Sequence, residues 1–265
     1  MFVVPSTMLM GGSKMSSEQS VFENPQALRL VGMSSALQKV LVTPNMTAMS
    51  IVDILAFLTC EELQYKSQRK RDQLFKAAKL KQGQACVENI DHLAKRGIDK
   101  SYLISLIDCE WITRNQFLII TGPTGVGKSW IACALANKAI KLNLSVLYKR
   151  FGLLMEELDI AHRDGSLPRL RNQLSKFKLL ILDDWAMAPL SDRNRQDLLE
   201  LIEERVESGS LIITTQLPVS KWHEYIGEPT IADAIMDRII HRAHRLELHG
   251  ESMRKTYKTV KEDKV

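Results

Sequence analysis

The spacing of apolar residues changes along the chain from a helical pattern to alternating strand and helix patterns. Within LRLVGMSSALQKVL the apolar residues recur every three to four positions, and residues 49–81 continue without a proline. This predicts a small all-helical unit over residues 27–84. From residue 116 onward, short β-rich runs alternate with helical patterns. These runs are QFLIIT at 116–121, SVLYK at 145–149, KLLILD at 178–183, SLIITT at 210–215 and HRLELH at 244–249.

Strands that alternate with helices predict a mainly parallel sheet with right-handed crossovers. We therefore predict an α/β fold in which residues 116–250 form a five-stranded sheet flanked by helices. The remaining segments predict a linker with a short helix at 85–115, a disordered segment at 1–26 that is rich in Ser, Gly and Met, and a basic tail at 251–265.

Composition and charge limit the classes of protein that this chain can represent. With 265 residues, 45% of them hydrophobic, it can bury one large core and a small one. A net charge of +5 allows an anionic partner such as nucleic acid. The four cysteines form no CxxC pair, so a zinc site is not indicated, and no apolar run approaches the ~18 residues that span a bilayer. We expect a soluble cytoplasmic protein without a membrane partner.

A phosphate-binding loop is the clearest chemical motif. GPTGVGKS, residues 122–129, matches G-x-x-x-x-G-K-[ST] between an apolar strand and a helical run. Its glycines let backbone amides approach phosphate oxygens, Lys128 is expected to reach the β- and γ-phosphates of ATP, and Ser129 is expected to bind Mg²⁺. The predicted nucleotide-binding residues are Gly122, Pro123, Thr124, Gly125, Val126, Gly127, Lys128, Ser129 and Trp130.

Two adjacent carboxylates end the apolar run LLILDDW, residues 179–185. Ligands bind at the carboxyl ends of parallel strands, so Asp183 is expected to hold Mg²⁺ with its hydration shell. Successive strand side chains point to opposite faces, which predicts a different role for Asp184 in orienting or deprotonating the attacking water. The alternative is that both residues only cap the following turn.

The run LIITTQLP places Thr214, Thr215 and Gln216 at the same edge of the predicted sheet. We predict that Thr215 or Gln216 contacts the γ-phosphate or the water. The alternative is an ordinary bend before Pro218, because threonine is also a good strand residue.

A basic stretch, KSQRKRDQLFKAAKLK at 66–81, predicts a helix with a positive surface. Its contacts with double-stranded DNA would be largely independent of sequence and weakened by salt. The alternative is a solubilising helix. The predicted DNA-binding residues are Lys66, Arg69, Lys70, Arg71, Lys76 and Lys79.

The motifs GPTGVGKS, LLILDDWAMAPL, LIITTQLPVSKWHE and IGEPTIADAIMDRIIHRAHRLELHGESMRK occur in this order. Together they resemble the IstB-like transposition helper ATPases of insertion sequences, over residues 28–255. The resemblance implies an AAA+ P-loop ATPase, related to DnaC-type helicase loaders, whose subunits assemble on DNA with ATP and assist a partner transposase.

The resemblance also implies roles for three further positions. Arg238 is similar to the arginine finger that completes an AAA+ site from a neighbouring subunit, which implies a homo-oligomer, although the residue also fits a solvated helix face. Arg254 is similar in position to the sensor-2 arginine of AAA+ proteins. Asp184 replaces the glutamate of many AAA+ proteins, so its carboxylate lies one methylene further from the water and slow hydrolysis is expected.

Three functions remain open from the sequence. The first is a DNA-dependent ATPase that assists transposition, and the second is a helicase loader of the same class. The third is a DNA-binding adaptor that uses bound ATP as a scaffold with negligible hydrolysis. A nucleotide kinase and an ABC-type ATPase are disfavoured, because no arginine-rich lid segment and no LSGGQ-like signature occur.

Overall fold

The computed structural model describes residues 25, 27–43, 49–90 and 97–253. Contacts divide the chain into two compact units, Met1–Lys70 and Arg71–Val265. Most of the segments predicted at 1–26 and 251–265 lie outside the described residues. Each unit is described separately below.

The first unit contains the helix α2, Val31–Val42, and the greater part of the helix α4, Ile51–Ala78. Its small core consists of Ala36, Val40 and Leu58. The two helices approach closely at Gly32, where a Cβ would lie only 2.7 Å from the backbone oxygen of Glu61. The predicted helical character of this region is confirmed.

The second unit begins inside α4, so residues 71–84 of the predicted helical domain pack with the sheet domain. The helix ends at Ala78, and Lys79 follows in a left-handed backbone conformation with a φ of 50°. Asn137 then holds the next segment, because its Nδ2 donates to the backbone oxygens of Gly83 at 2.9 Å and Ala85 at 2.6 Å. A short 3-10 helix, Val87–Asn89, comes next.

Five parallel strands form the sheet, in the order β2-β3-β4-β1-β5. The five-stranded prediction is confirmed, with strand ends that shift by one or two residues. The observed strands are β1 Phe117–Thr121, β2 Val146–Arg150, β3 Leu179–Trp185, β4 Ser210–Thr215 and β5 Ala243–Glu247.

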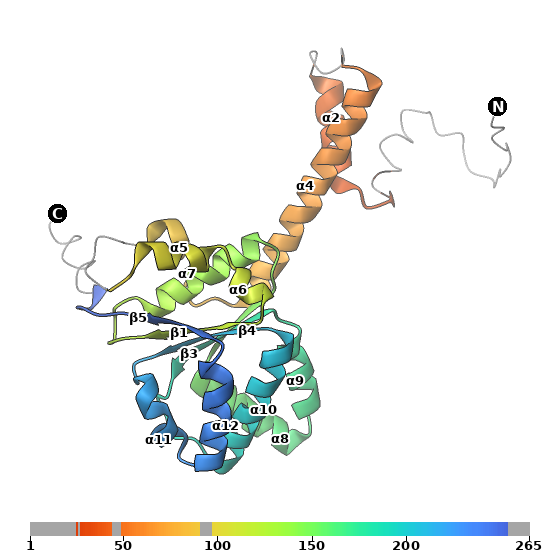
Figure 1. Cartoon of the computed structure of the whole chain (residues 1–265). Coiled ribbons are helices and arrows are strands. Elements are labelled where there is room, and N and C mark those ends of the chain that lie inside the picture. The colour runs from red at the N-terminus through yellow and green to blue at the C-terminus, as the bar shows by residue number, and fades with distance from the viewer. Residues whose placement is uncertain (1–24, 26, 44–48, 91–96, 254–265) are drawn as a thin grey trace, which may run out of the picture. The chain divides into compact units, whose positions relative to one another are not determined.

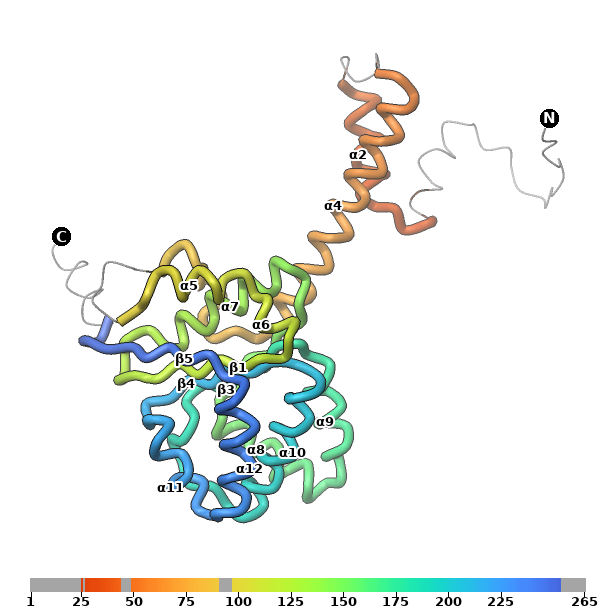
Figure 2. The backbone as a smooth tube through the Cα atoms, viewed as in Figure 1, coloured from red at the N-terminus to blue at the C-terminus, as the bar shows by residue number. Residues whose placement is uncertain are grey.

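Helices cover both faces of the sheet in a three-layer arrangement (Figure 1, and as a backbone trace in Figure 2). One face carries α5 Lys100–Ile107, α6 Glu110–Thr113 and α7 Lys128–Lys141. The other carries α8 Phe151–Asp164, α9 Leu167–Ser175, α10 Asp192–Ser208, α11 Trp222–Ile226 and α12 Pro229–Ile240, with a 3-10 turn at Val219–Lys221.

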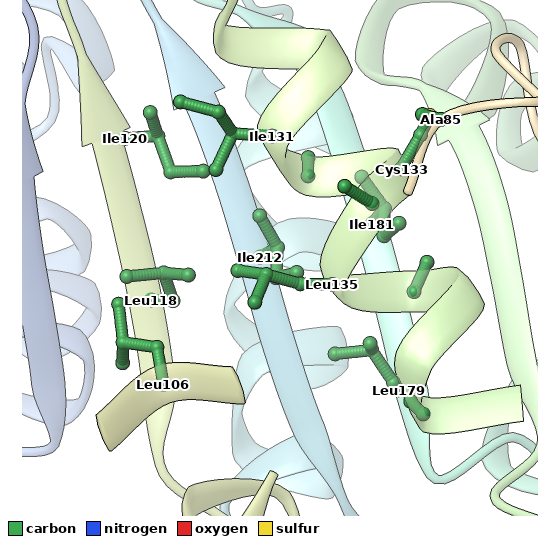
Figure 3. Packing of buried hydrophobic residues seen from close by; sticks show 14 of the residues in the cluster. Ala85, Leu106, Leu118, Ile120, Ile131, Cys133, Leu135, Leu179, Ile181 and Ile212 are labelled. Carbon is green, nitrogen blue, oxygen red and sulfur yellow. The ribbon is translucent and has the colours of Figure 1, made fainter. Parts of the chain in front are cut away.

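Apolar side chains fill both interfaces, which explains why the strands are almost continuously hydrophobic. Figure 3 shows Ile181 and Ile212 in one cluster with Ile131 of α7. Residues at alternating positions, such as Leu180 and Leu182, join the cluster on the opposite face. The sheet is thus packed on both faces up to its carboxyl edge, where the polar residues of the motifs lie.

Candidate nucleotide-binding site

The phosphate loop connects β1 to α7 and depends on glycine conformations. Gly122, Gly125 and Gly127 have φ values of 143°, 85° and 100°, in the left-handed region that side chains rarely adopt. A Cβ on Gly122 would lie 2.3 Å from the backbone oxygen of Leu248. The loop leads into the first turn of α7, and the backbone amides at a helix N-terminus are groups that bind phosphate.

The side chains of the loop divide into supporting and accessible groups. Val126 is fully buried and Trp130 packs against the core, so these two predicted nucleotide-binding residues anchor the loop to the core. Pro123 and Thr124 are exposed. Lys128 is 8% exposed, and its Nζ donates to the backbone oxygens of Gly122 and Pro123, both at 2.7 Å. Its ammonium group is therefore held against the phosphate loop, where it is predicted to bind phosphate.

Asp183 lies at the end of the buried part of β3 and is fully buried. Its Oδ1 accepts hydrogen bonds from Ser129 Oγ at 2.7 Å and Thr214 Oγ1 at 2.5 Å. Its Oδ2 accepts from Tyr148 Oη at 2.5 Å and from Lys81 Nζ at 3.2 Å. Four donors from four different segments thus converge on one carboxylate.

These donors determine the protonation state of the carboxylate. Burial alone would raise the pKa of Asp183, but the three hydroxyl hydrogen bonds and the charge of Lys81 outweigh it, so the pKa lies below its ordinary value. The pKa of Tyr148 is raised, first by burial and then by its hydrogen bond to Asp183. Asp183 is therefore an anion and Tyr148 a neutral donor at neutral pH.

Asp184 departs from regular strand geometry. Its φ is 62°, and the register of β3 against β4 shifts between Leu182 and Trp185. The expectation that the two carboxylates point to opposite faces is wrong, because this bulge brings both to one ammonium group. Lys81 Nζ lies 3.2 Å from Asp183 Oδ2 and 3.8 Å from Asp184 Oδ2.

The partners of the two carboxylates still differ. The side chain of Asp184 is 32% exposed, and its Oδ2 lies 3.6 Å from Nε of Arg150, whose own side chain is 58% exposed. Its backbone N–H donates to Thr214 Oγ1 at 3.2 Å. Asp184 is the more accessible of the two carboxylates, as a group that orients water requires.

Ser129 and Asp183 present suitable ligands for Mg²⁺. A hydroxyl and a carboxylate oxygen lie 2.7 Å apart beside the phosphate loop. Mg²⁺ prefers oxygen ligands, and it is usually held by one or two protein groups together with phosphates and water. Among the residues that the structure describes, no group of three or more His, Cys, Asp or Glu side chains could hold a metal ion. The oxygens of Ser129 and Asp183 fit Mg²⁺ that is also bound by phosphates and water.

At the end of β4, the structure places Thr214 next to Asp183, whereas Thr215 faces away from it. Thr215 is buried, donates to the backbone oxygen of Trp185 at 3.0 Å and accepts from the N–H of Leu217. Gln216 is exposed, and its Nε2 lies 3.7 Å from Met187 Sδ. The hydroxyl of Thr215 is thus engaged in holding the strand end, and Thr214 is the threonine at the carboxylate.

Comparison with known proteins agrees with this geometry. The family model described as IstB-like ATP binding protein matches residues 24–261. The chain belongs to this family. An insertion sequence ATP-binding protein of Sinorhizobium fredii, y4pL, is 44% identical over 226 residues, which cover 85% of this chain and 92% of the relative. The ATP-binding protein of insertion sequence IS1162 from Pseudomonas fluorescens is 43% identical, over 73% of this chain and 84% of the relative.

Solved structures support the fold of this IstB-like chain. DnaI is similar with a TM-score of 0.53 and 20% identity, over 67% of this chain and 93% of DnaI. AMPPCP-bound DnaA from Aquifex aeolicus has a TM-score of 0.52 and 17% identity, over 68% of this chain and 54% of that chain. The chain therefore shares the fold of DnaI and DnaA, and its family membership supports ATP binding.

Two predicted residues of the IstB-like chain lie away from the phosphate loop or beyond the described residues. Arg238, on α12, donates from Nη1 to the backbone oxygen of Ala234 at 2.9 Å and pairs through Nη2 with Glu203 Oε1 at 2.6 Å. Its side chain is 35% exposed and is paired with Glu203. Arg254 lies outside the described residues.

The predicted DNA-binding residues lie on or just after α4. Lys66 forms an ion pair with Glu62 at 3.3 Å, and its side chain is 59% exposed. At ~100° per residue, Lys66, Arg69, Lys70 and Lys76 fall on about one third of the helix circumference, and Arg71 lies apart from them. Lys79 follows the end of the helix and is exposed. Among the described residues, no helix is both long and apolar enough to cross a membrane.

Sequence reasoning did not assign Lys81 or Tyr148 to the nucleotide site, and it favoured Thr215 over Thr214. Lys81 was grouped with the basic stretch, but the structure places it at the two carboxylates. The run SVLYK did contain a signal for Tyr148, because a phenolic hydroxyl follows two apolar residues near the carboxyl end of the strand. Using that signal would have required knowing that β2 pairs with β3.

Proposed function

We propose that this IstB-like chain is an ATP-dependent, DNA-binding helper of an insertion-sequence transposon. It binds ATP with Mg²⁺, assembles on double-stranded target DNA and assists its partner transposase. The observation that carries the nucleotide chemistry is the 2.7 Å contact between Ser129 Oγ and Asp183 Oδ1 beside Lys128. In this scheme Lys128 binds the β- and γ-phosphates, Ser129 and Asp183 hold Mg²⁺, and Asp184 orients the attacking water.

Hydrolysis is proposed to be slow and to be stimulated by DNA or by assembly. Asp184 is one methylene shorter than the glutamate that many AAA+ proteins carry, and its bulged backbone fixes where the short carboxylate can reach. Slow turnover would allow an ATP-bound assembly to persist on DNA until the transposase arrives.

Assembly is proposed to use Arg238 as a finger that acts on a neighbouring subunit. A guanidinium delivered in trans stabilises the charge that develops on the γ-phosphoryl group. The exposed basic residues of α4 are proposed to contact DNA phosphates without reading sequence. The names of the relatives, which refer to insertion sequences, support the link to transposition.

The experiment that tests the helper role is a strand-transfer reaction with the transposase of the insertion sequence proposed to encode this chain. We expect the yield of inserted product to rise when the chain and ATP are both present, and to fall back when ADP replaces ATP. A yield that does not change with the chain and ATP would contradict the proposal. The Lys128→Ala variant serves as the matched control, because it keeps α4 intact.

A DnaC-type helicase loader is the second candidate, since the IstB-like family is related to that group. An adaptor that keeps ATP unhydrolysed is the third. Finding a transposase gene next to the gene for this chain would support the helper over the loader. ATP turnover with and without duplex DNA separates the helper from the adaptor, which should show near-zero rates in both conditions.

A further inference from the structure

Lys81 lies in the segment between α4 and the 3-10 helix Val87–Asn89, and its ammonium group reaches both carboxylates at the end of β3. Nζ is 3.2 Å from Asp183 Oδ2 and 3.8 Å from Asp184 Oδ2. Its side chain is 37% exposed, whereas that of Asp183 is fully buried. A monovalent cation that belongs to the chain therefore lies close both to Asp183, the proposed metal ligand, and to Asp184, the proposed water-orienting group.

The segment around Lys81 is anchored, so this contact is more than a chance surface pairing. Before it, the buried Ala78 ends α4 and Lys79 turns the chain with a φ of 50°. After it, Asn137 on α7 donates to the backbone oxygens of Gly83 and Ala85. The helix that begins at the phosphate loop thus also fixes the segment that carries Lys81.

Asp183 has no acceptor capacity left for a further cation. A carboxylate offers about four lone-pair sites. Four donors fill them: Ser129, Thr214, Tyr148 and Lys81. Tyr148 and Thr214 are 8% and 1% exposed, so Ser129 and Lys81 are the partners with room to move. Of these two only Lys81 is charged, and a second cation on the same carboxylate would be repelled by it.

We propose that Lys81 is a further positioning residue of the metal site. Its ammonium group holds Asp183 and Asp184 in place in the nucleotide-free protein, and Mg²⁺ bound to ATP displaces it. This inference rests on the metal role proposed for Asp183. The consequence is that free Mg²⁺ competes poorly for the site, so the ion enters together with the triphosphate.

The test measures binding of a fluorescent ATP analogue as Mg²⁺ is titrated, for the wild type and for Lys81→Met. The equilibrium between Mg²⁺ and nucleotide in solution is common to both proteins, so a difference reports the site. We expect Lys81→Met to reach half-maximal binding at about three- to tenfold lower Mg²⁺, the range for removing one partly exposed charge. Lys81→Arg, which keeps the charge, should resemble the wild type.

Lys141→Met is the matched control, because Lys141 is 61% exposed and its nearest carboxylate, on Glu88, is 4.0 Å away. It should titrate like the wild type. An unchanged Mg²⁺ requirement in folded Lys81→Met would overturn the proposal, and a higher requirement would do so as well, since it would make Lys81 a phosphate ligand. If Asp183→Asn leaves the Mg²⁺ requirement of the wild type unaltered, the metal role of Asp183 fails independently of Lys81.

Discussion

The phosphate site and the basic helix α4 carry the two halves of the proposed function, and they are built in different ways. In the phosphate site, Asp183 is fully buried and has four donors within 3.2 Å. On α4, the basic residues are largely exposed, and Lys66 forms its ion pair at the surface. One region depends on individual contacts and the other on summed charge.

This difference decides how each region responds to mutation. Leaving a buried polar group without its hydrogen-bond partner lowers the free energy of unfolding by about 1–3 kcal/mol. Single substitutions in the phosphate site should therefore have large effects on stability. Exposed ion pairs contribute about 0.2–1 kcal/mol, so single substitutions on α4 should have little effect on folding. On α4, a measurable loss of DNA binding should require several charge changes together.

The largest effect is expected from a residue that lies outside the phosphate site of its own chain. Arg238→Ala should leave ATP affinity unchanged and lower ATP turnover by about a thousandfold, because it removes the charge proposed to act in trans. Steady-state turnover and equilibrium nucleotide binding measure the two effects. Mixing the variant with wild-type protein should lower the wild-type rate, and a simple average of the two rates would count against action in trans.

The next largest effect is a loss of DNA affinity when positive charges on α4 are reversed. Reversing Arg69, Lys70 and Arg71 to glutamate should weaken duplex DNA binding by about a hundredfold or more and flatten its dependence on salt. ATP binding should not change. Fluorescence anisotropy of a labelled duplex over a range of salt measures both quantities.

A matched triple reversal of Arg163, Arg169 and Lys176, which are exposed on or next to α8 and α9, makes the same change in net charge. It should retain most of the DNA affinity. Equal losses in the two triple variants would mean that net charge, and not the position of α4, governs binding.

The smallest effect concerns the pH dependence of stability. The pKa of Asp183 is lowered in the folded protein, so its contribution to stability is complete above the unfolded pKa of about 3.9 and is lost as pH falls through the lower folded value. Asp183→Asn lacks this contribution. The difference in free energy of unfolding between wild type and variant should hold steady above about pH 5 and shrink in acid. Urea titrations across this range measure it, and a difference that grows in acid would refute the assignment.

Local patterns predicted much of this molecule, because buried strands and phosphate loops need particular residues at fixed spacing. The five strands follow from such patterns, as does the position of the loop at the start of α7, whereas the AAA+ fold was implied by the family resemblance. The DNA-binding surface and the finger Arg238 stay predictions, because exposed charges leave no comparable pattern. At Asp184 the strand is bulged, so the side-chain direction expected from regular strand alternation is wrong.

Lys81 could not be assigned from local patterns for a different reason. It lies 102 residues before Asp183 in the sequence, and the two meet only because the segment after α4 packs on α7. In the sequence it is one of many lysines in a basic stretch. Contacts over such distances depend on the packed fold, which charge and periodicity do not specify.

The most direct test of the division of labour between the two carboxylates is ATP turnover in the presence of duplex DNA, for wild type, Asp184→Glu and Asp184→Ala. If Asp184 orients the water, Asp184→Glu should turn ATP over faster, by about tenfold, and Asp184→Ala should bind ATP but lose turnover by about a hundredfold or more. The ATP-bound Asp184→Ala protein should also remain on DNA. Equal rates in all three proteins would contradict a catalytic role for Asp184.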